Sequence, residues 1–288
     1  MSIIKYLASD NIFFLIFIGI LSAEIGSFLN VIIYRLPIMM KQSFRQECND
    51  FLNNDIPKKQ EVFNLSFPRS QCPKCKTKIP FWYNLPVIGF IILRGKCHNC
   101  KSSISWGYPL VELLTIVASL FVVYKFGFTL QSVALLLLTW GLIPLIFIDF
   151  AEQFLPDSIL LPLLWLGLLL SPLQLFTTPE NAIFGAVFGY LSLWIVAKLF
   201  KLIRKIDGMG NGDFKLFALF GAWFGWQILP FIILLASLLG IAAGITLIMC
   251  KKLEFNKPMP FGPYIAFAGW FFIFYGEVAM RYFYRLFL

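Results

Sequence analysis

Two aspartates at the edges of apolar segments are the residues of this chain best suited to acid–base chemistry. Asp149 ends the apolar segment 130–149, and Asp213 begins the segment 213–227. Carboxylates beside membrane-length apolar segments are costly and mark candidate functional sites. Two neighbouring carboxyl groups do not both ionise readily, so one can donate a proton to a carbonyl while the other takes a proton from water. The pattern indicates hydrolysis by an acid–base pair.

Three glycines precede the second aspartate, at Gly208, Gly210 and Gly212. They remove side chains from its approach, so an extended substrate backbone could lie alongside. Simpler roles stay open, because Asp213 could cap a helix and Asp149 could lie at the lipid interface. The other acids at or near apolar segments are Glu24, Glu112, Asp157 and Glu277.

Four cysteines form two CxxC pairs, Cys72-Pro-Lys-Cys75 and Cys97-His-Asn-Cys100, with 21 residues between them. This spacing is typical of a tetrahedral structural zinc site in which each pair supplies a tight knuckle. Disulfides are the alternative, which a reducing compartment disfavours. Four sulfurs complete the ligand shell, so we expect His98 to be a surface residue. Cys48 and Cys250 are expected to be free thiols.

The composition places these residues in a membrane protein. Of the 288 residues, 59% are hydrophobic and 14% are charged, whereas a soluble domain carries about 25% charged residues. The apolar stretch that ends at Ile33 is too long for the apolar core of a signal peptide, and we expect it to be a retained first span. The net charge of +9 comes without a basic stripe interleaved with aromatic residues, so no nucleic-acid partner is expected.

Hydropathy predicts an all-α polytopic fold of about eight transmembrane helices with a small cytoplasmic zinc-binding domain between spans one and two. The expected spans are 12–34, 108–126, 130–149, 157–174, 182–200, 213–227, 229–250 and 262–282. A turn is required near Trp226 to Pro230, because one helix through both flanking segments would exceed the bilayer.

The predicted domains are a first span at 1–36, the cytoplasmic zinc domain at 37–107 and a seven-span core at 108–288. The zinc domain shows no clear helical period beyond a short piece near 81–93, and 41–66 resembles an exposed insertion. A cytoplasmic 35–107 segment holds 12 of the 24 Lys and Arg, and the loops 198–215 and 251–257 bring the total on that side to 20. The positive-inside rule then predicts periplasmic termini.

Several motifs together resemble one family, the type IV prepilin peptidases, which combine leader peptidase and N-methyltransferase activities. The resembling segments are Gly208-Met-Gly-Asn-Gly-Asp-Phe-Lys215, Ile148-Asp149 with Leu155-Pro-Asp157, Gly26-Ser-Phe-Leu-Asn-Val-Ile-Ile-Tyr-Arg-Leu-Pro37, both cysteine pairs, Arg94-Gly-Lys96, Tyr108-Pro-Leu-Val-Glu112 and Pro260-Phe-Gly-Pro263. They cover nearly the whole chain except 41–66. The chain departs from the family pattern at Arg204-Lys-Ile-Asp207 and at Glu24.

The resemblance implies an aspartic endopeptidase of the bacterial inner membrane, with Asp149 and Asp213 catalytic at the cytoplasmic face. It implies cleavage of the basic leader of prepilins and pseudopilins, then methylation of the new N-terminus by S-adenosylmethionine. Such an enzyme supports pilus biogenesis and type II secretion. By the same resemblance Gly95 and Lys96 are candidates for methyl transfer, although Lys96 could be a solvated loop residue. Glu112 is a candidate base, or else a helix-packing partner for a cytoplasmic lysine.

Three further acids could receive the basic leader, because the segment from Asp149 to Asp157 contains no Lys or Arg. We expect Glu152, Asp157 and Asp207 to form an acidic rim, unless they pair with the nearby Lys201, Arg204 and Lys205. A transporter or a scaffold protein would also contain many spans. A transporter places its ionisable groups near the midplane, and a scaffold needs no second aspartate at matched depth.

Overall fold

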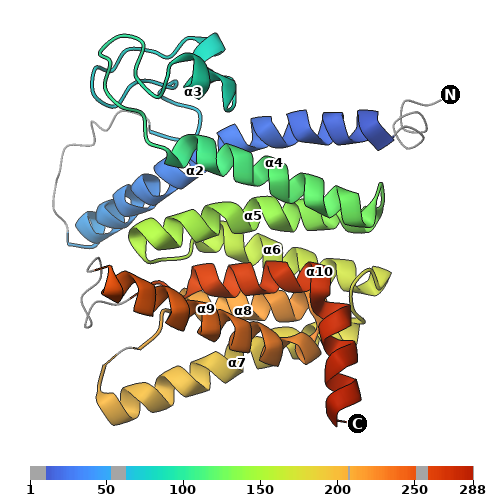
Figure 1. Ribbon diagram of the computed structural model, residues 1–288. Coiled ribbons are helices and arrows are strands. Elements are labelled where there is room, and N and C mark those ends of the chain that lie inside the picture. The colour runs from blue at the N-terminus through green and yellow to red at the C-terminus, as the bar shows by residue number, and fades with distance from the viewer. Residues whose placement is uncertain (1–10, 53–62, 207, 251–258, 288) are drawn as a thin grey trace. The chain divides into compact units, whose positions relative to one another are not determined.

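The computed structural model describes residues 11–52, 63–206, 208–250 and 259–287, of which residues 11 and 277–287 are described by their helical backbone alone. This part of the chain is helical and contains no strand, only two isolated bridges. The long helices are α2 (Asn11–Phe51), α4 (Gly107–Phe126), α5 (Leu130–Glu152), α6 (Asp157–Leu170), α7 (Pro179–Arg204), α8 (Asn211–Phe224), α9 (Leu229–Met249) and α10 (Gly262–Phe287) (Figure 1). The predicted all-α class is confirmed for the described residues.

Each expected span coincides with one of these helices, but their lengths differ. Five stretches are long and apolar enough to cross a membrane: Ile12–Phe51, Gly107–Phe126, Leu130–Glu152, Pro179–Arg204 and Trp226–Met249. The apolar stretch Asp157–Leu173 is shorter, and α8 has 14 residues. The count of eight spans therefore stays a prediction.

The required turn between the sixth and seventh expected spans is confirmed. Helix α8 ends at Phe224, Gly225 takes a φ of +86°, and the short helix η3 (Trp226–Ile228) leads into α9. A positive φ is accessible to glycine without a steric cost, which explains the residue at this position.

The first helix is much longer than the expected span 12–34. It has 41 residues, includes Pro37 and continues to Phe51. The sequence after Pro37 showed no clear helical period, but the helix continues through residues 38–51. At 1.5 Å per residue the helix measures about 62 Å, roughly twice the thickness of a bilayer core. Residues 41–47 of this helix are exposed and, apart from Phe44, polar.

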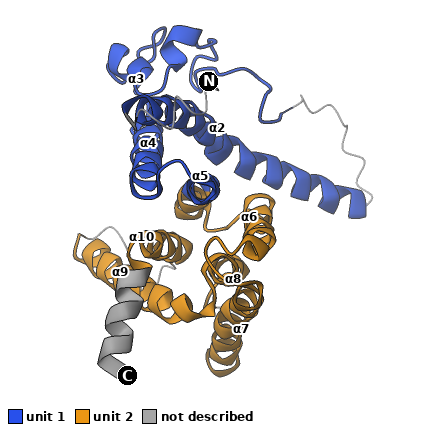
Figure 2. Ribbon diagram, turned by 90° about the vertical axis from the view of Figure 1, so that its right-hand side faces the viewer, with its two compact units in different colours: residues 1–144 blue, residues 145–288 orange. Residues whose placement is uncertain are grey.

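The described chain forms two compact units, residues 1–144 and 145–288 (Figure 2). In the first unit α2 packs against α4. A Cβ on Gly26 would lie 2.9 Å from the Cα of Glu112, and the amide of Asn30 donates to the carbonyl of Tyr108 at 3.0 Å. The small cysteine-containing segment joins these two helices and includes η1 (Phe81–Asn84) and α3 (Ile88–Ile92).

In the second unit α8 is the central helix, and it contacts α6, α7, α9 and α10 (Figure 2). Ten of its 14 residues are buried. Gly185 of α7 meets Gly221 of α8 backbone to backbone, and Gly189 faces Ala218, so the small residues of α7 serve close helix packing. The indole of Trp223 donates to the carbonyl of Leu163 in α6 at 2.8 Å. Helix α8 is thereby fixed on several sides.

Candidate active site and metal site

Asp149 lies in the last turn of α5, where the chain leaves the helix. The amide of Gln153 donates to the carbonyl of Asp149 at 3.0 Å, and Gln153 then takes a φ of +56°, which ends the helix. The side chain of Asp149 is 5% exposed, and its Oδ2 is buried without a hydrogen-bond partner. The backbone amide of Gly262, at the start of α10, lies against this carboxyl group. A buried carboxyl oxygen without a partner is uncommon and costly, so it marks a candidate site.

Asp213 lies in the first turn of α8 and is 8% exposed. Gly210 is the N-cap residue, and its backbone amide lies against the Asp213 carboxyl, so Asp213 does serve part of the capping role that its position suggested. Asp149 and Asp213 lie within the same compact unit, although they are 64 positions apart in the sequence.

Leu155 is the shared neighbour of the segments that carry the two aspartates. It lies in the connection between α5 and α6 and is 9% exposed. A Cβ on Gly212 would lie 2.9 Å from the Cβ of Leu155, and a Cβ on Gly262 would lie 3.2 Å from its Cδ1. The same Cβ on Gly262 would lie 2.6 Å from Oδ2 of Asp149. Glycine at 212 and 262 therefore lets three chain segments meet at the aspartates.

An ion pair fastens the connection to α8. The Nζ of Lys215 lies 2.8 Å and 2.7 Å from the two carboxylate oxygens of Asp157, which is the first residue of α6. Lys215 follows Asp213 by two residues, and Asp157 follows Leu155 by two. The pair thus joins the two segments on which Leu155 and Asp213 lie, a contact that the spacing of these residues did not predict.

Two of the three residues of the predicted acidic rim, Glu152 and Asp157, lie in the described part of the chain. Asp157 already has Lys215 as a counter-charge, which is neither of the roles expected for it. Glu152 is the last residue of α5 and is exposed, but it is not without an interaction partner. Asp207 lies outside the described residues. Leader binding by these acids stays a prediction.

The glycines before Asp213 have internal neighbours. A Cβ on Gly208 would lie 2.7 Å from the ring of Phe200, and Gly212 faces Leu155 as described above. Gly210 differs, because the nearest neighbour of a Cβ there would be Oδ2 of Asp213 at 3.8 Å. Packing thus accounts for Gly208 and Gly212, while Gly210 alone leaves room beside the carboxyl group.

The four cysteines of the two CxxC pairs form a single cluster in the first unit. Their sulfur atoms all lie within 4.8 Å of one another, and the cluster could hold a metal ion. His98 is not a member of the cluster; its ring lies 5.4 Å from that of Tyr83. Thiolate ligands brought this close suit a tetrahedral metal.

Two similar turns build this cluster. In the first, the amide of Cys72 donates to Thr77 at 3.0 Å and Lys76 takes a φ of +57°; in the second, the amide of Cys97 donates to Ser102 at 2.8 Å and Lys101 takes a φ of +57°. Hydrogen bonds from Thr77 lower the pKa of Cys75 to about 6. Backbone amides of Cys75 and Lys74 lower the pKa of Cys72. Both thiols are thereby biased towards the thiolate form that binds metal.

Gly95 and Lys96 lie directly before the second knuckle. Gly95 has a φ of +67°, and its carbonyl accepts from the amide of Ile104 at 2.7 Å, so a turn requires glycine here. Lys96 is exposed and forms an isolated bridge with Ser103. Their proposed role in methyl transfer stays a prediction.

Glu112 is 8% exposed in α4 and accepts the backbone amide of Val87 at 2.7 Å. Val87 has a φ of +60°, which is strained for a β-branched residue. The buried carboxylate thus holds the cysteine-containing segment against α4. The packing partner is a backbone amide rather than the lysine that had been considered.

Comparison with known proteins places this architecture in a family. The profile "Bacterial Peptidase A24 N-terminal domain" matches residues 20–126, and the profile "Type IV leader peptidase family" matches residues 136–245. The first match contains the cysteine cluster and the second contains both aspartates. The chain belongs to the type IV leader peptidase family.

Relatives named prepilin leader peptidase/N-methyltransferase align over almost their full length. The protein from Pseudomonas aeruginosa is 47% identical, with 98% of this chain and 97% of the relative covered. Those from Aeromonas hydrophila and Legionella pneumophila are 46% and 41% identical, with 93% and 92% of this chain covered and 92% of each relative. No solved structure shows a significant match.

Proposed function

We propose that this protein cleaves the basic leader peptide of type IV prepilins and pseudopilins and then methylates the new N-terminus. The observation that carries the proposal is that two buried carboxyl groups, Asp149 and Asp213, lie beside glycines that pack against the same residue, Leu155, in a chain that belongs to the type IV leader peptidase family. The names of the relatives support both activities.

In the proposed hydrolysis one aspartate is protonated and the other is ionised. The ionised carboxylate takes a proton from water as the water oxygen attacks the scissile carbonyl carbon, and the protonated aspartate donates to the carbonyl oxygen. The tetrahedral intermediate then breaks its C–N bond. The aspartate that took the proton from water donates it to the departing amine nitrogen, and the other aspartate takes back the hydroxyl proton as the carbonyl re-forms. The substrate backbone would approach along Gly210, where space remains beside Asp213.

The cysteine cluster would hold one structural zinc ion through Cys72, Cys75, Cys97 and Cys100. Four protein ligands leave no open coordination position, so no catalytic step passes through this site. Its contribution would be to the folding of a polar segment that is too small for a core of its own.

The second activity requires a methyl donor, which by family resemblance is S-adenosylmethionine. When bound, the donor supplies an electrophilic methyl group to the new terminal amine. Gly95 and Lys96 are the proposed donor-binding residues, and Glu112 the proposed base. Because Glu112 already accepts the amide of Val87, its alternative role is to position the cysteine-containing segment.

We further propose the bacterial inner membrane as the location, with eight spans, both termini in the periplasm and the aspartates at the cytoplasmic face. The apolar helices and the excess of Lys and Arg in the proposed cytoplasmic segments support this arrangement. The proposed roles are pilus biogenesis and type II secretion, with prepilins, pseudopilins and lipid as partners.

A direct test is mass spectrometry of the pilin N-terminus from cells with and without this protein. Cells that contain it should yield a pilin without its leader whose first residue carries an added methyl group. An intact leader in both strains would contradict the proposal, and a cleaved but unmethylated pilin would leave only the peptidase.

A further inference from the structure

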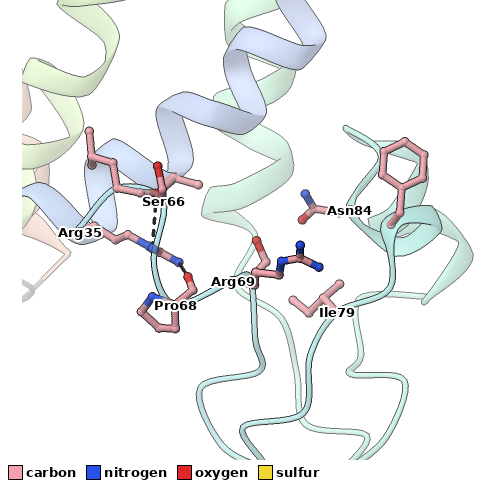
Figure 3. Close-up of a pocket in the computed structure, with 10 residues that line it drawn as sticks. Arg35, Ser66, Pro68, Arg69, Ile79 and Asn84 are labelled. Carbon is pink, nitrogen blue, oxygen red and sulfur yellow. Dashed lines mark hydrogen bonds between the residues drawn. The ribbon is translucent and has the colours of Figure 1, made fainter. Parts of the chain in front are cut away.

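A cavity of about 320 Å³ lies within the first unit, between α2 and the segments 65–70 and 79–84 (Figure 3). Its polar lining includes Arg35, Arg69 and Asn84, and its apolar lining includes Val31, Ile79 and Phe81. Small-molecule sites usually combine an apolar wall with a few polar groups in this way. The acid–base pair lies in the other unit, so this cavity needs a separate explanation.

Arg35 is rigidly held beside the cavity. It is 9% exposed, and its guanidinium donates to the carbonyls of Asn64 at 2.8 Å and Pro68 at 2.6 Å while lying over the ring of Phe63. All of these partners are neutral, so they satisfy its hydrogen bonds without cancelling its charge. A buried charge is stabilised when an opposite charge lies nearby.

Arg69 supplies a second guanidinium that is exposed to the cavity. Figure 3 shows its head group extending between Asn84 and Ile79. In the described part of the chain neither Arg69 nor Arg35 pairs with a carboxylate. A guanidinium fork beside a side-chain amide presents several N–H donors to one region, an arrangement that suits a planar carboxylate.

We propose that this cavity binds the amino-acid end of the methyl donor, with the donor's carboxylate on Arg69 and Asn84. The inference rests on the proposed methyltransferase function. Arg35 contributes fixed positive charge, and the apolar lining contacts the hydrocarbon and ring portions of the ligand. The carboxylate is the one negative group of S-adenosylmethionine, which makes it the part that this positive cavity selects.

Two probes separate the ends of the ligand. S-adenosylhomocysteine keeps the amino-acid end, whereas 5′-methylthioadenosine lacks it. Calorimetry on the full chain in detergent should show that Arg69→Ala weakens S-adenosylhomocysteine by about 10–100-fold, which is typical of losing a hydrogen bond to a charged group. The affinity for methylthioadenosine should stay within about twofold, because that probe has no carboxylate for Arg69 to bind.

Charge variants test the sign of the bound group. Asn84→Asp places a negative charge beside the ligand and should weaken S-adenosylhomocysteine more than Asn84→Ala does. Arg69→Lys keeps the charge without the fork and should give an intermediate affinity. The matched control is Arg45→Ala, which removes an exposed arginine of α2 outside the cavity. Zinc content and melting temperature report whether each variant is folded.

Several outcomes would overturn the assignment. Equal weakening of both probes by Arg69→Ala, or tighter binding by Asn84→Asp, would reject carboxylate recognition. Binding of phosphatidylglycerol in nanodiscs that depends on Arg69, with no such dependence for S-adenosylhomocysteine, would make the cavity a lipid site. If the wild-type protein methylates pilin but Arg69→Ala binds S-adenosylhomocysteine normally, only this inference fails. If the wild-type protein neither methylates pilin nor binds S-adenosylhomocysteine, the proposed transferase fails as well.

Discussion

At the residue scale, the candidate active site consists of two carboxyl groups that the protein buries without an ion-pair partner in the described chain. Asp149 and Asp213 are 5% and 8% exposed, and the backbone amides of Gly262 and Gly210 lie against them. A lysine or arginine beside either carboxylate would hold it ionised, and the acid role would be lost. Neutral backbone donors do not fix either carboxyl group in its ionised form, which is compatible with the proposed acid and base roles.

The first prediction concerns the proposed acid and base roles of these two carboxyl groups. Asp149→Asn or Asp213→Asn should lower the cleavage rate by about 10²–10⁴-fold, because an amide supplies neither the general acid nor the general base. Cleavage of a purified prepilin can be followed by mass spectrometry, with membrane insertion checked by fractionation. The control is Glu180→Gln, an exposed acid in the first turn of α7. Wild-type processing by Asp149→Asn would remove the pair, and Asp157 would be tested next.

The second prediction concerns Gly262. A methyl group there would lie 2.6 Å from Oδ2 of Asp149, closer than real contacts allow, so Gly262→Ala must displace the carboxyl group. A displacement of about 1 Å can cost about 10²-fold in rate, so we expect kcat to fall with little change in KM. The matched variant is Gly244→Ala in α9, where a Cβ would meet only Met259 at 3.7 Å. Equal activity of the two variants would show that Gly262 does not position Asp149.

The reactive residues could be predicted from the sequence, but their neighbours could not. Aspartates beside apolar segments and paired cysteines stand out by residue type and spacing. Leu155, Lys215 and Gly262 are ordinary residues whose roles depend on contacts between segments far apart in the chain. Leu155 and Gly262 do lie in the family motifs Leu155-Pro-Asp157 and Pro260-Phe-Gly-Pro263. A motif alone, however, does not say which residues contact each other.

At the scale of elements, the connection between α5 and α6 packs against the segments that carry the two aspartates. Leu155 contacts the glycines beside both, and the Asp157–Lys215 pair holds this connection on α8. The paired side chains are 50% and 29% exposed. Such a surface pair contributes about 0–1 kcal/mol to stability, so its value would lie in positioning rather than in holding the fold.

The third prediction follows from this difference. Asp157→Asn and Lys215→Met should each lower kcat by about tenfold or more while leaving the melting temperature nearly unchanged, because alignment is affected more than stability. The exchanged variant Asp157→Lys with Lys215→Asp should recover part of the lost rate. If Asp157→Asn instead raises KM with kcat unchanged, and the exchange rescues nothing, Asp157 belongs to leader binding.

The fourth prediction concerns the two knuckles around the cysteine cluster. Purified protein should carry about one zinc ion per chain, as four thiolates in a tetrahedral site imply. Cys72→Ser should abolish zinc binding and lower the melting temperature, because the metal joins two turns that share few other contacts. Cys48→Ser serves as the control, since Cys48 lies outside the cluster. Folded, active protein without zinc by elemental analysis would contradict the site.

The length of α2 shows where hydropathy fails as a guide to elements. Hydropathy locates the apolar part of a helix, and Pro37 together with the polar residues after it indicated an end. Met, Lys, Gln, Arg and Glu in 38–51 are nonetheless good helix formers. A proline inside a helix removes a backbone hydrogen bond and crowds the preceding turn, but it can kink a helix without ending it. The helix therefore extends beyond the apolar segment at the C-terminal end of this span.

At the scale of the whole molecule, the order of helices could be predicted because each apolar segment is separated from the next by polar or turn-forming residues. The number of crossings is harder to predict. At 1.5 Å per residue the 14 residues of α8 span about 21 Å, less than the roughly 30 Å of a bilayer core. Whether α8 crosses the membrane thus depends on the residues that flank it. Hydropathy alone does not decide the number of transmembrane spans.

The last prediction tests the crossings through the two ends of α10. Eight spans place both termini in the periplasm, and 20 of the 24 Lys and Arg then lie on the cytoplasmic side. Alkaline phosphatase fused after Leu288 should be active, because this enzyme requires the periplasm, whereas fusion within 251–257 should be inactive. Green fluorescent protein should give the opposite result at each position. Fluorescence at Leu288 together with phosphatase activity at 251–257 would mean an even number of crossings between the periplasmic N-terminus and that loop, instead of the expected seven. The short α6 and α8 would then be the helices to test, and Asp213 would no longer be certain to share a membrane face with Asp149.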